Sequence, residues 1–112
     1  VEIRDAFARD AAAKLARAGF GNVNVVVGDG ARGWGKDTYD AVVLTGSTPV
    51  LHDAFFGQLN PGGRVFAIVG DAPAMTARIH RYSAPGARTA VSLFETVVRP
   101  LVNAPSPARF EF

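Results

Sequence analysis

The clearest chemical signal in this sequence is a glycine-rich segment that follows one apolar run and precedes another, Val27-Gly28-Asp29-Gly30-Ala31-Arg32-Gly33-Trp34. Glycines permit positive φ and a close backbone approach, while the carboxylate of Asp29 can accept hydrogen bonds from a bound amine or hydroxyl. The segment therefore predicts a ligand-binding corner at the end of a strand. The same residue types also form ordinary strand-ending turns, and that interpretation stays open.

Few other side chains are candidates for catalysis, ligand binding or metal binding. His52 could act as a general base, but we expect it exposed in the first turn of a helix. His80 is expected at the surface of a hairpin. Trp34 could cover an aromatic ligand, although a lone tryptophan after a glycine is more often partly buried. Two histidines and no cysteine are too few for a zinc cluster, so no metal site is predicted.

The length and composition indicate one globular domain that is large enough to bury a hydrophobic core. The chain has 112 residues, of which 48% are hydrophobic and 20% are charged, and no apolar run approaches the roughly twenty residues that span a bilayer. The net charge of +2 comes from scattered Lys and Arg residues, so neither a membrane nor a nucleic acid is predicted as a partner. The lack of cysteine fits a cytoplasmic protein.

The elements that must position these residues alternate between strands and helices. Phe7, Ala11, Leu15 and Ala18 predict an amphipathic helix over Arg4 to Gly19. Nearly continuous apolar runs predict strands covered on both faces. The expected strands are Val1–Ile3, Asn22–Val27, Asp40–Leu44 and Arg64–Val69; the other expected helices are Val50–Leu59, stopped by Asn60-Pro61-Gly62-Gly63, and a short one within Ala31–Thr38.

After Gly70 the pattern changes to alternating apolar and polar residues. Ala74–Tyr82 and Thr89–Val98 flank a Ser83-Ala84-Pro85-Gly86 turn, which predicts a hairpin. The predicted fold is therefore α/β, with a Rossmann-like, mostly parallel sheet that ends in an antiparallel hairpin. Its expected core contains Phe55, Phe56, Leu59, Phe66 and Ile68.

Several strings, taken in order, resemble the C-terminal half of protein-L-isoaspartate O-methyltransferases over nearly all of the chain. They are Asn22-Val23, Gly28-Asp29-Gly30 with Gly33-Trp34, Tyr39-Asp40-Ala41, Gln58-Leu59-Asn60-Pro61-Gly62-Gly63-Arg64, Val69-Gly70, and Leu93-Phe94-Glu95 followed by Pro100-Leu101. The resemblance implies a seven-stranded sheet that binds S-adenosylmethionine at the C-terminal ends of its parallel strands.

The family's Gly-rich loop and its substrate-contacting segment have no counterpart before Glu2. We therefore expect residues 1–112 to be a partial S-adenosylmethionine-dependent methyltransferase domain, with the N-terminal part of the fold missing. An apolar edge and face would then be left uncovered, which predicts a homo-oligomer or association with the missing N-terminal segment.

The resemblance assigns cofactor-binding roles residue by residue. Glu2 matches the acidic residue that holds the ribose hydroxyls, and a carboxylate can accept from two vicinal hydroxyls at once. Asp29 matches the residue that accepts from the adenine amino group, and Gly30 gives the ring room. Thr45 opens a loop that borders the cofactor's reacting methyl group in the family.

The next three residues of that loop, Gly46, Ser47 and Thr48, depart from the family's usual alanines. Their hydroxyls could orient a substrate carboxylate or hydroxyl, or cap the helix expected near Val50, and the cap is slightly favoured. Contact with substrate would make a methyl acceptor other than isoaspartate plausible.

The expected activity is S-adenosylmethionine-dependent O-methylation of L-isoaspartyl carboxylates in damaged proteins. Its partner would be an isoaspartyl protein or peptide, or a small carboxylate-bearing molecule. The alternative is a diverged or truncated, non-catalytic protein of the same fold that acts by binding or assembly. A nicotinamide dinucleotide domain is disfavoured because it fits the C-terminal hairpin poorly.

Overall fold

The chain forms two compact units, Val1–Gly30 and Ala31–Phe112, and each is described by itself. The computed structural model describes residues 1–84 and 87–107. The single, partial methyltransferase domain expected over residues 1–112 stays a prediction.

The first unit is built on helix α1, Asp5–Arg17, a little shorter than predicted. Its first turn carries an acidic residue and its last turn two basic ones, which complements the helix dipole. Gly19 follows the C-cap with φ +84°, a conformation that ends a helix readily. The predicted apolar stripe is only partly buried, because Ala11 and Leu15 are half-buried whereas Phe7 and Ala18 are exposed.

The strand predicted at Asn22–Val27 does not form as a ladder. A single parallel bridge joins Glu2 to Val27, with Glu2 N–H donating to the Val26 carbonyl at 2.9 Å and Gly28 N–H donating to the Glu2 carbonyl at 3.0 Å. The prediction of two strands was wrong because a strand needs a run of partners, and the described residues supply one bridge.

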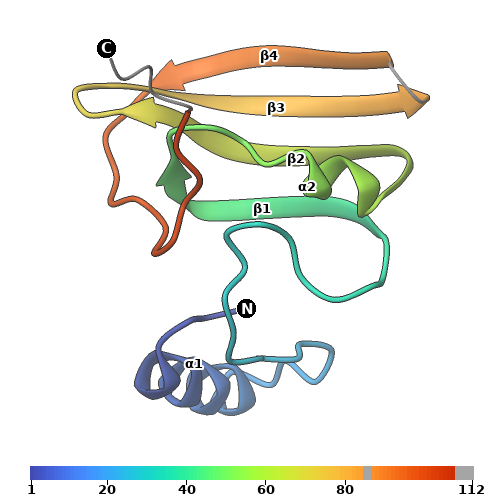
Figure 1. The fold of residues 1–112 in the computed structure, drawn as a ribbon. Coiled ribbons are helices and arrows are strands. Elements are labelled where there is room, and N and C mark those ends of the chain that lie inside the picture. The colour runs from blue at the N-terminus through green and yellow to red at the C-terminus, as the bar shows by residue number, and fades with distance from the viewer. Residues whose placement is uncertain (85–86, 108–112) are drawn as a thin grey trace. The chain divides into compact units, whose positions relative to one another are not determined.

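The described residues of the second unit form a four-stranded mixed sheet and one short helix (Figure 1). Strands β1 and β2 are parallel, whereas β2–β3 and β3–β4 are antiparallel, and the strand order is β1-β2-β3-β4. The elements are β1 Tyr39–Thr48, α2 Ala54–Gly57, β2 Leu59–Asp71, β3 Ala74–Ala84 and β4 Ala87–Glu95.

This arrangement confirms the α/β class and the C-terminal hairpin. Within the described sheet, parallel pairing is limited to β1 and β2, together with an isolated bridge from Ser47 to Pro100. Two residues of the predicted turn, Pro85 and Gly86, lie outside the described residues. The short helix expected within Ala31–Thr38 is absent, because that segment consists of turns, bends and an isolated bridge.

Helix α2 is a single turn instead of the predicted Val50–Leu59. The helix ends at Gly57, before Asn60-Pro61-Gly62-Gly63, so the prediction that this segment stops it was wrong. The segment instead lies within β2, which begins at Leu59. Gly62 has φ +78°, and a Cβ on Gly63 would lie 2.8 Å from the Asn60 carbonyl oxygen. Glycine is therefore required where the chain bulges against β1 before regular pairing resumes at Arg64.

The larger of two buried clusters joins α2 to the sheet. Phe55 and Phe56 of α2 pack with Leu59, Val65 and Ala67 in one buried cluster, and Ile68, Met75 and Ala77 form a second. The predicted core is confirmed, with Phe66 half-buried beside the second cluster. Burial on both faces was wrong for β1, since Val43 is 62% exposed.

The turn from β2 to β3 depends on Gly70. Its φ is +126°, and a Cβ there would lie 2.3 Å from the Ala74 carbonyl oxygen. We expect Gly70→Ala to lower the free energy of unfolding by about 1–3 kcal/mol, because strain and overlap add. Gly57→Ala is the control, since nothing lies within 4 Å of a Cβ there. Urea unfolding measures both; equal stability of the two variants would contradict this account.

Candidate functional site

Two predicted cofactor-binding carboxylates lie near the same corner of the first unit. The bridge between Glu2 and Val27 aligns the two backbone segments in parallel, and Asp29 follows two residues after Val27. One oxygen of Glu2, Oε1, accepts the Arg4 backbone N–H at 3.0 Å, so the carboxylate is already oriented at the start of α1. The side chain of Asp29 is exposed.

Gly30 has room for more than hydrogen. Its φ lies outside the left-handed region, and a Cβ there would lie 3.6 Å from Val1 Cγ1, an ordinary contact. Neighbouring residues therefore do not require glycine at this position. Room for an adenine ring, which would explain the glycine, stays a prediction.

In the second unit, the C-terminal end of β1 is irregular. Val43 pairs with Phe66, and Ser47 pairs with Ile68. Between these two pairs the chain advances four residues in β1 but only two in β2. Thr45 and Gly46 lie in this bulge, and Thr45 is exposed. Bulges of this kind redirect side chains at the ends of strands.

A segment after β4 packs across the bulge and explains Gly46. A Cβ on Gly46 would lie 2.7 Å from Leu101 Cδ2 and 3.2 Å from the Leu101 backbone nitrogen. The close approach of this backbone therefore accounts for a glycine where the family usually has alanine.

Ser47 and Thr48 are almost completely buried, at 0% and 1% exposure. Ser47 Oγ donates to the Val98 carbonyl at 3.1 Å, and the Ser47 backbone bonds to Arg99 and Leu101. Thr48 Oγ1 donates to the Val50 carbonyl at 2.6 Å. Neither hydroxyl caps α2, so the capping interpretation was wrong. Substrate contact by residues 46–48 stays a prediction, although both hydroxyls already have protein partners.

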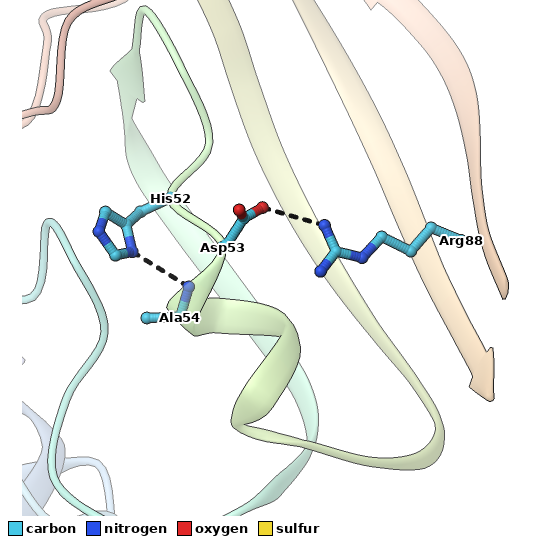
Figure 2. A network of polar contacts seen from close by, with 4 residues as sticks. All are labelled: His52, Asp53, Ala54 and Arg88. Atoms are coloured by element: carbon cyan, nitrogen blue, oxygen red, sulfur yellow. Dashed lines mark hydrogen bonds and ion pairs between the residues drawn. The ribbon is translucent and has the colours of Figure 1, made fainter. Parts of the chain in front are cut away.

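His52 lies just before α2 (Figure 2) and is half-buried. Its Nδ1 accepts the Ala54 backbone N–H at 3.0 Å, so in the neutral ring the proton is on Nε2. The lone pair of Nδ1 is thereby engaged in starting α2. This structural use replaces the exposed position expected for His52.

Arg88 of β4 reaches α2 and joins the hairpin to it. Its Nη1 lies 2.9 Å from Asp53 Oδ1 (Figure 2). Its guanidinium carbon lies 4.1 Å from the centroid of the Phe56 ring. Asp53 is largely exposed, so the ion pair adds little by itself. The stacking covers one side of a core aromatic ring.

His80 was expected at the surface, but it is half-buried in β3 and packs edge-on against Phe56 at 5.8 Å between ring centroids. Burial and the nearby charge of Arg78 lower the pKa of His80 below its ordinary value. Its Nε2 has no hydrogen-bond partner among the described residues. The alternation of the hairpin correctly placed His80 on a strand but could not tell which face α2 would cover.

The loop before β1 forms a shallow, open cleft of about 250 Å³, which is smaller than most small-molecule pockets. Gln58 closes one side of it: Trp34 N–H donates to Gln58 Oε1 at 2.9 Å, and Gln58 Nε2 donates back to the Trp34 carbonyl. Trp34 is about one-third exposed, which agrees with the predicted partial burial. A role in covering an aromatic ligand stays a prediction. The lining residues are Arg32, Gly33, Trp34, Gly35, Ala54 and Gln58.

The roles of Gln58 and Arg88 were missed by sequence reasoning. Both act across more than twenty residues of sequence, and no local pattern marks such partners. Residues 1–84 and 87–107 contain no group of three or more His, Asp or Glu side chains able to hold a metal ion. In the same part of the chain, neither helix has the length and apolar character needed to cross a membrane.

Comparison with solved structures identifies the fold first. A protein-L-isoaspartate O-methyltransferase matches with a TM-score of 0.77 at 24% identity, over 88% of this chain and 32% of that chain. A Plasmodium falciparum protein assigned to the same methyltransferases, in complex with S-adenosyl-L-homocysteine, matches with a TM-score of 0.75 at 10% identity, over 89% and 50%. The fold is therefore that of a methyltransferase.

The family follows from the sequence. The family model for protein-L-isoaspartate(D-aspartate) O-methyltransferase matches residues 1–103, and this chain belongs to that family. The resemblance stated from the motifs is thus confirmed.

Two curated relatives show how much of the family's length is represented. Protein-L-isoaspartate O-methyltransferase 1 of Geotalea uraniireducens is 38% identical over 86 residues, which cover 74% of this chain and 39% of the relative. The enzyme of Methanoculleus marisnigri is 46% identical over 57 residues, which cover 50% of this chain and 26% of the relative. The chain therefore spans well under half the length of these proteins.

The buried hydroxyl of Ser47 is expected to hold the segment after β4 in place. Ser47→Ala removes its bond to Val98 and leaves that carbonyl unpaired, which should lower the free energy of unfolding by about 1–2 kcal/mol. Ser83→Ala removes an exposed hydroxyl that also donates to a carbonyl, at 3.3 Å, and should change stability by less than about 0.5 kcal/mol. Denaturant titrations of both variants compare the effects; indistinguishable midpoints would count against the role of Ser47.

The lowered pKa of His80 predicts a pH dependence. The unfolded chain binds a proton at His80 more readily than the fold, so stability is present above the ordinary pKa, near 6.5, and is lost as the pH falls through the range below it. We expect His80→Leu to remove this component. Urea unfolding between pH 5 and 8, for the wild type and the variant, gives the two slopes. Parallel slopes would show that His80 does not contribute.

Proposed function

We propose that the protein containing this chain is an S-adenosylmethionine-dependent O-methyltransferase that esterifies the carboxylate of L-isoaspartyl residues in damaged proteins. The observation that carries the proposal is the family match over residues 1–103. We include in the proposal a cytoplasmic location, supported by the lack of cysteine, and isoaspartyl proteins or peptides as partners.

The residues present fit the adenosine part of the cofactor. Glu2 uses one carboxylate oxygen for Arg4, and its second oxygen is available among the described residues, which suits a ribose diol. Asp29 offers an exposed carboxylate to an amino group from the neighbouring segment. These two acidic residues, with Gly30, would hold the cofactor; the bound complex of the Plasmodium falciparum neighbour supports this choice of ligand.

The reaction asks the protein for orientation more than for proton transfer. When bound, S-adenosylmethionine supplies a methyl group that is already strongly electrophilic. The acceptor carboxylate is ionised at neutral pH, so no general base is needed. The engagement of His52 Nδ1 by Ala54 is therefore compatible with activity. The protein's contribution is to align the reacting groups and exclude water.

At the end of β1, Thr45 is the hydroxyl we assign to this alignment. It is exposed at the bulge and forms no side-chain hydrogen bond with the described residues, unlike Ser47 and Thr48. The buried hydroxyls instead support the backbone beneath it. We therefore propose that Thr45 contacts the bound reactants and that Ser47 and Thr48 act through the shape of the bulge.

Calorimetric titration of the complete gene product with S-adenosylhomocysteine tests the cofactor site. We expect binding by the wild type and a loss of at least about tenfold in Asp29→Ala, because a charge-assisted hydrogen bond is removed. Asp37→Ala removes another exposed carboxylate, in the loop before β1, and should bind like the wild type.

A methylation assay with isoaspartyl and matched aspartyl peptides then tests the acceptor. Methyl transfer to the isoaspartyl peptide alone supports the proposal. Cofactor binding without transfer to either peptide favours a diverged, non-catalytic member of the fold. Absence of cofactor binding by the folded wild type would overturn the proposal.

A further inference from the structure

The side chain of Gln58 forms an unusual pairing with the backbone of the loop before β1. Its Oε1 accepts the Trp34 N–H at 2.9 Å. Its Nε2 donates to the Trp34 carbonyl and, at 3.2 Å, to the Gly35 carbonyl. The amide therefore engages both polar groups of one peptide residue, as a neighbouring strand would do.

The backbone of Gln58 is itself anchored on two sides. Its carbonyl accepts the N–H of Tyr39, the first residue of β1, at 2.7 Å. Its N–H donates to the Phe55 carbonyl at the end of α2, at 3.2 Å. Gln58 thus ties the loop, the helix and the first strand of the sheet together through one residue. A side chain held at its base this firmly loses little further freedom when it binds the loop.

Gly33 is shaped to this contact. Its φ is +95°, and a Cβ there would lie 2.8 Å from Gln58 Oε1 and 3.5 Å from Ala54 Cβ. The glycine lets the loop approach the amide closely enough for the three hydrogen bonds. The short distance between Gly33 and the Gln58 side chain indicates that the loop is held in one defined position.

The held segment is continuous in sequence with the predicted adenine-binding residues. Ala31 follows Gly30 directly, is 3% exposed, and forms an isolated bridge with Gly33. From Ala31 to Gly35 the chain is therefore fixed by burial, the bridge and the Gln58 amide. Asp29 and Gly30 are therefore joined directly, along the chain, to a segment whose backbone is held.

We infer that Gln58 is a positioning residue for cofactor binding, which holds the loop from Ala31 to Gly35 so that Asp29 and Gly30 meet the adenosine group. The inference rests on the proposed function. Gln58 need not touch the ligand, because its effect is to reduce the ordering that binding requires of the loop. Its loss is expected to weaken cofactor binding more than it slows methyl transfer at saturating cofactor.

Two variants of Gln58 and one control test this role. Gln58→Met keeps the length of the side chain but has no amide. Gln58→Glu keeps an acceptor for the Trp34 N–H. Its second carboxylate oxygen replaces the Nε2 donor and faces the carbonyls of Trp34 and Gly35. Asn60→Ala removes another side-chain amide, two residues away, which binds Asp40 Oδ1 at 2.9 Å and not the loop.

Three measurements on the complete gene product are needed. Titration with S-adenosylhomocysteine should show at least tenfold weaker binding for both Gln58 variants, with the control within about twofold of the wild type. Acrylamide quenching of tryptophan fluorescence, to which Trp34 contributes, should increase in the Gln58 variants alone, and Trp34→Phe identifies the part of the signal that comes from Trp34. In the methylation assay, KM for the cofactor should rise while kcat changes by less than about threefold.

The outcomes separate this inference from the proposed function. Binding by the wild type and equal binding by the folded Gln58 variants would overturn the inference and leave the proposed function standing. Failure of the folded wild type to bind would overturn both. If binding in both variants falls only as far as their folded fraction in urea titrations falls, Gln58 is merely structural and the inference is wrong.

Discussion

The arrangement depends on β2 being the most completely buried strand of the sheet. Val65 and Ala67 have no exposed surface, and the two phenylalanines of α2 cover them. Because β2 pairs with β1 on one side and β3 on the other, its burial holds the register of both neighbours. The parallel β1–β2 pair requires a crossover, and α2 supplies both that connection and the cover for the core.

At the end of β1, buried residues support the backbone that carries the exposed Thr45. The bulge exposes Thr45, while the segment after β4 occupies the space that a side chain on Gly46 would need. Ser47 and Thr48 satisfy backbone carbonyls in the buried layer beneath the bulge. The fold thus buries the hydroxyls of Ser47 and Thr48, which were predicted as substrate contacts, and leaves Thr45 exposed.

Elements with strong local signals were predicted well. The periodicity of α1, the apolar run of β2 and the alternation of the hairpin each reflect a local preference that the fold retains. The strand expected at Asn22–Val27 failed because extended structure needs partners, which local sequence does not supply. The exposure of Val43 and the burial of His80 were missed for a related reason, since neighbouring elements decide which faces of a strand are covered.

The sequence by itself determined the family, the α/β class, the core phenylalanines and the acidic corner around Asp29, because these depend on residue types at short and regular spacings. Only the tertiary structure decided that Gln58 forms hydrogen bonds with the loop around Trp34, that Arg88 joins β4 to α2, and that Ser47 bonds to the segment after β4. These contacts join residues more than twenty positions apart. The packing of the sheet and helix decides which of these residues meet, so no local sequence pattern predicts the contacts.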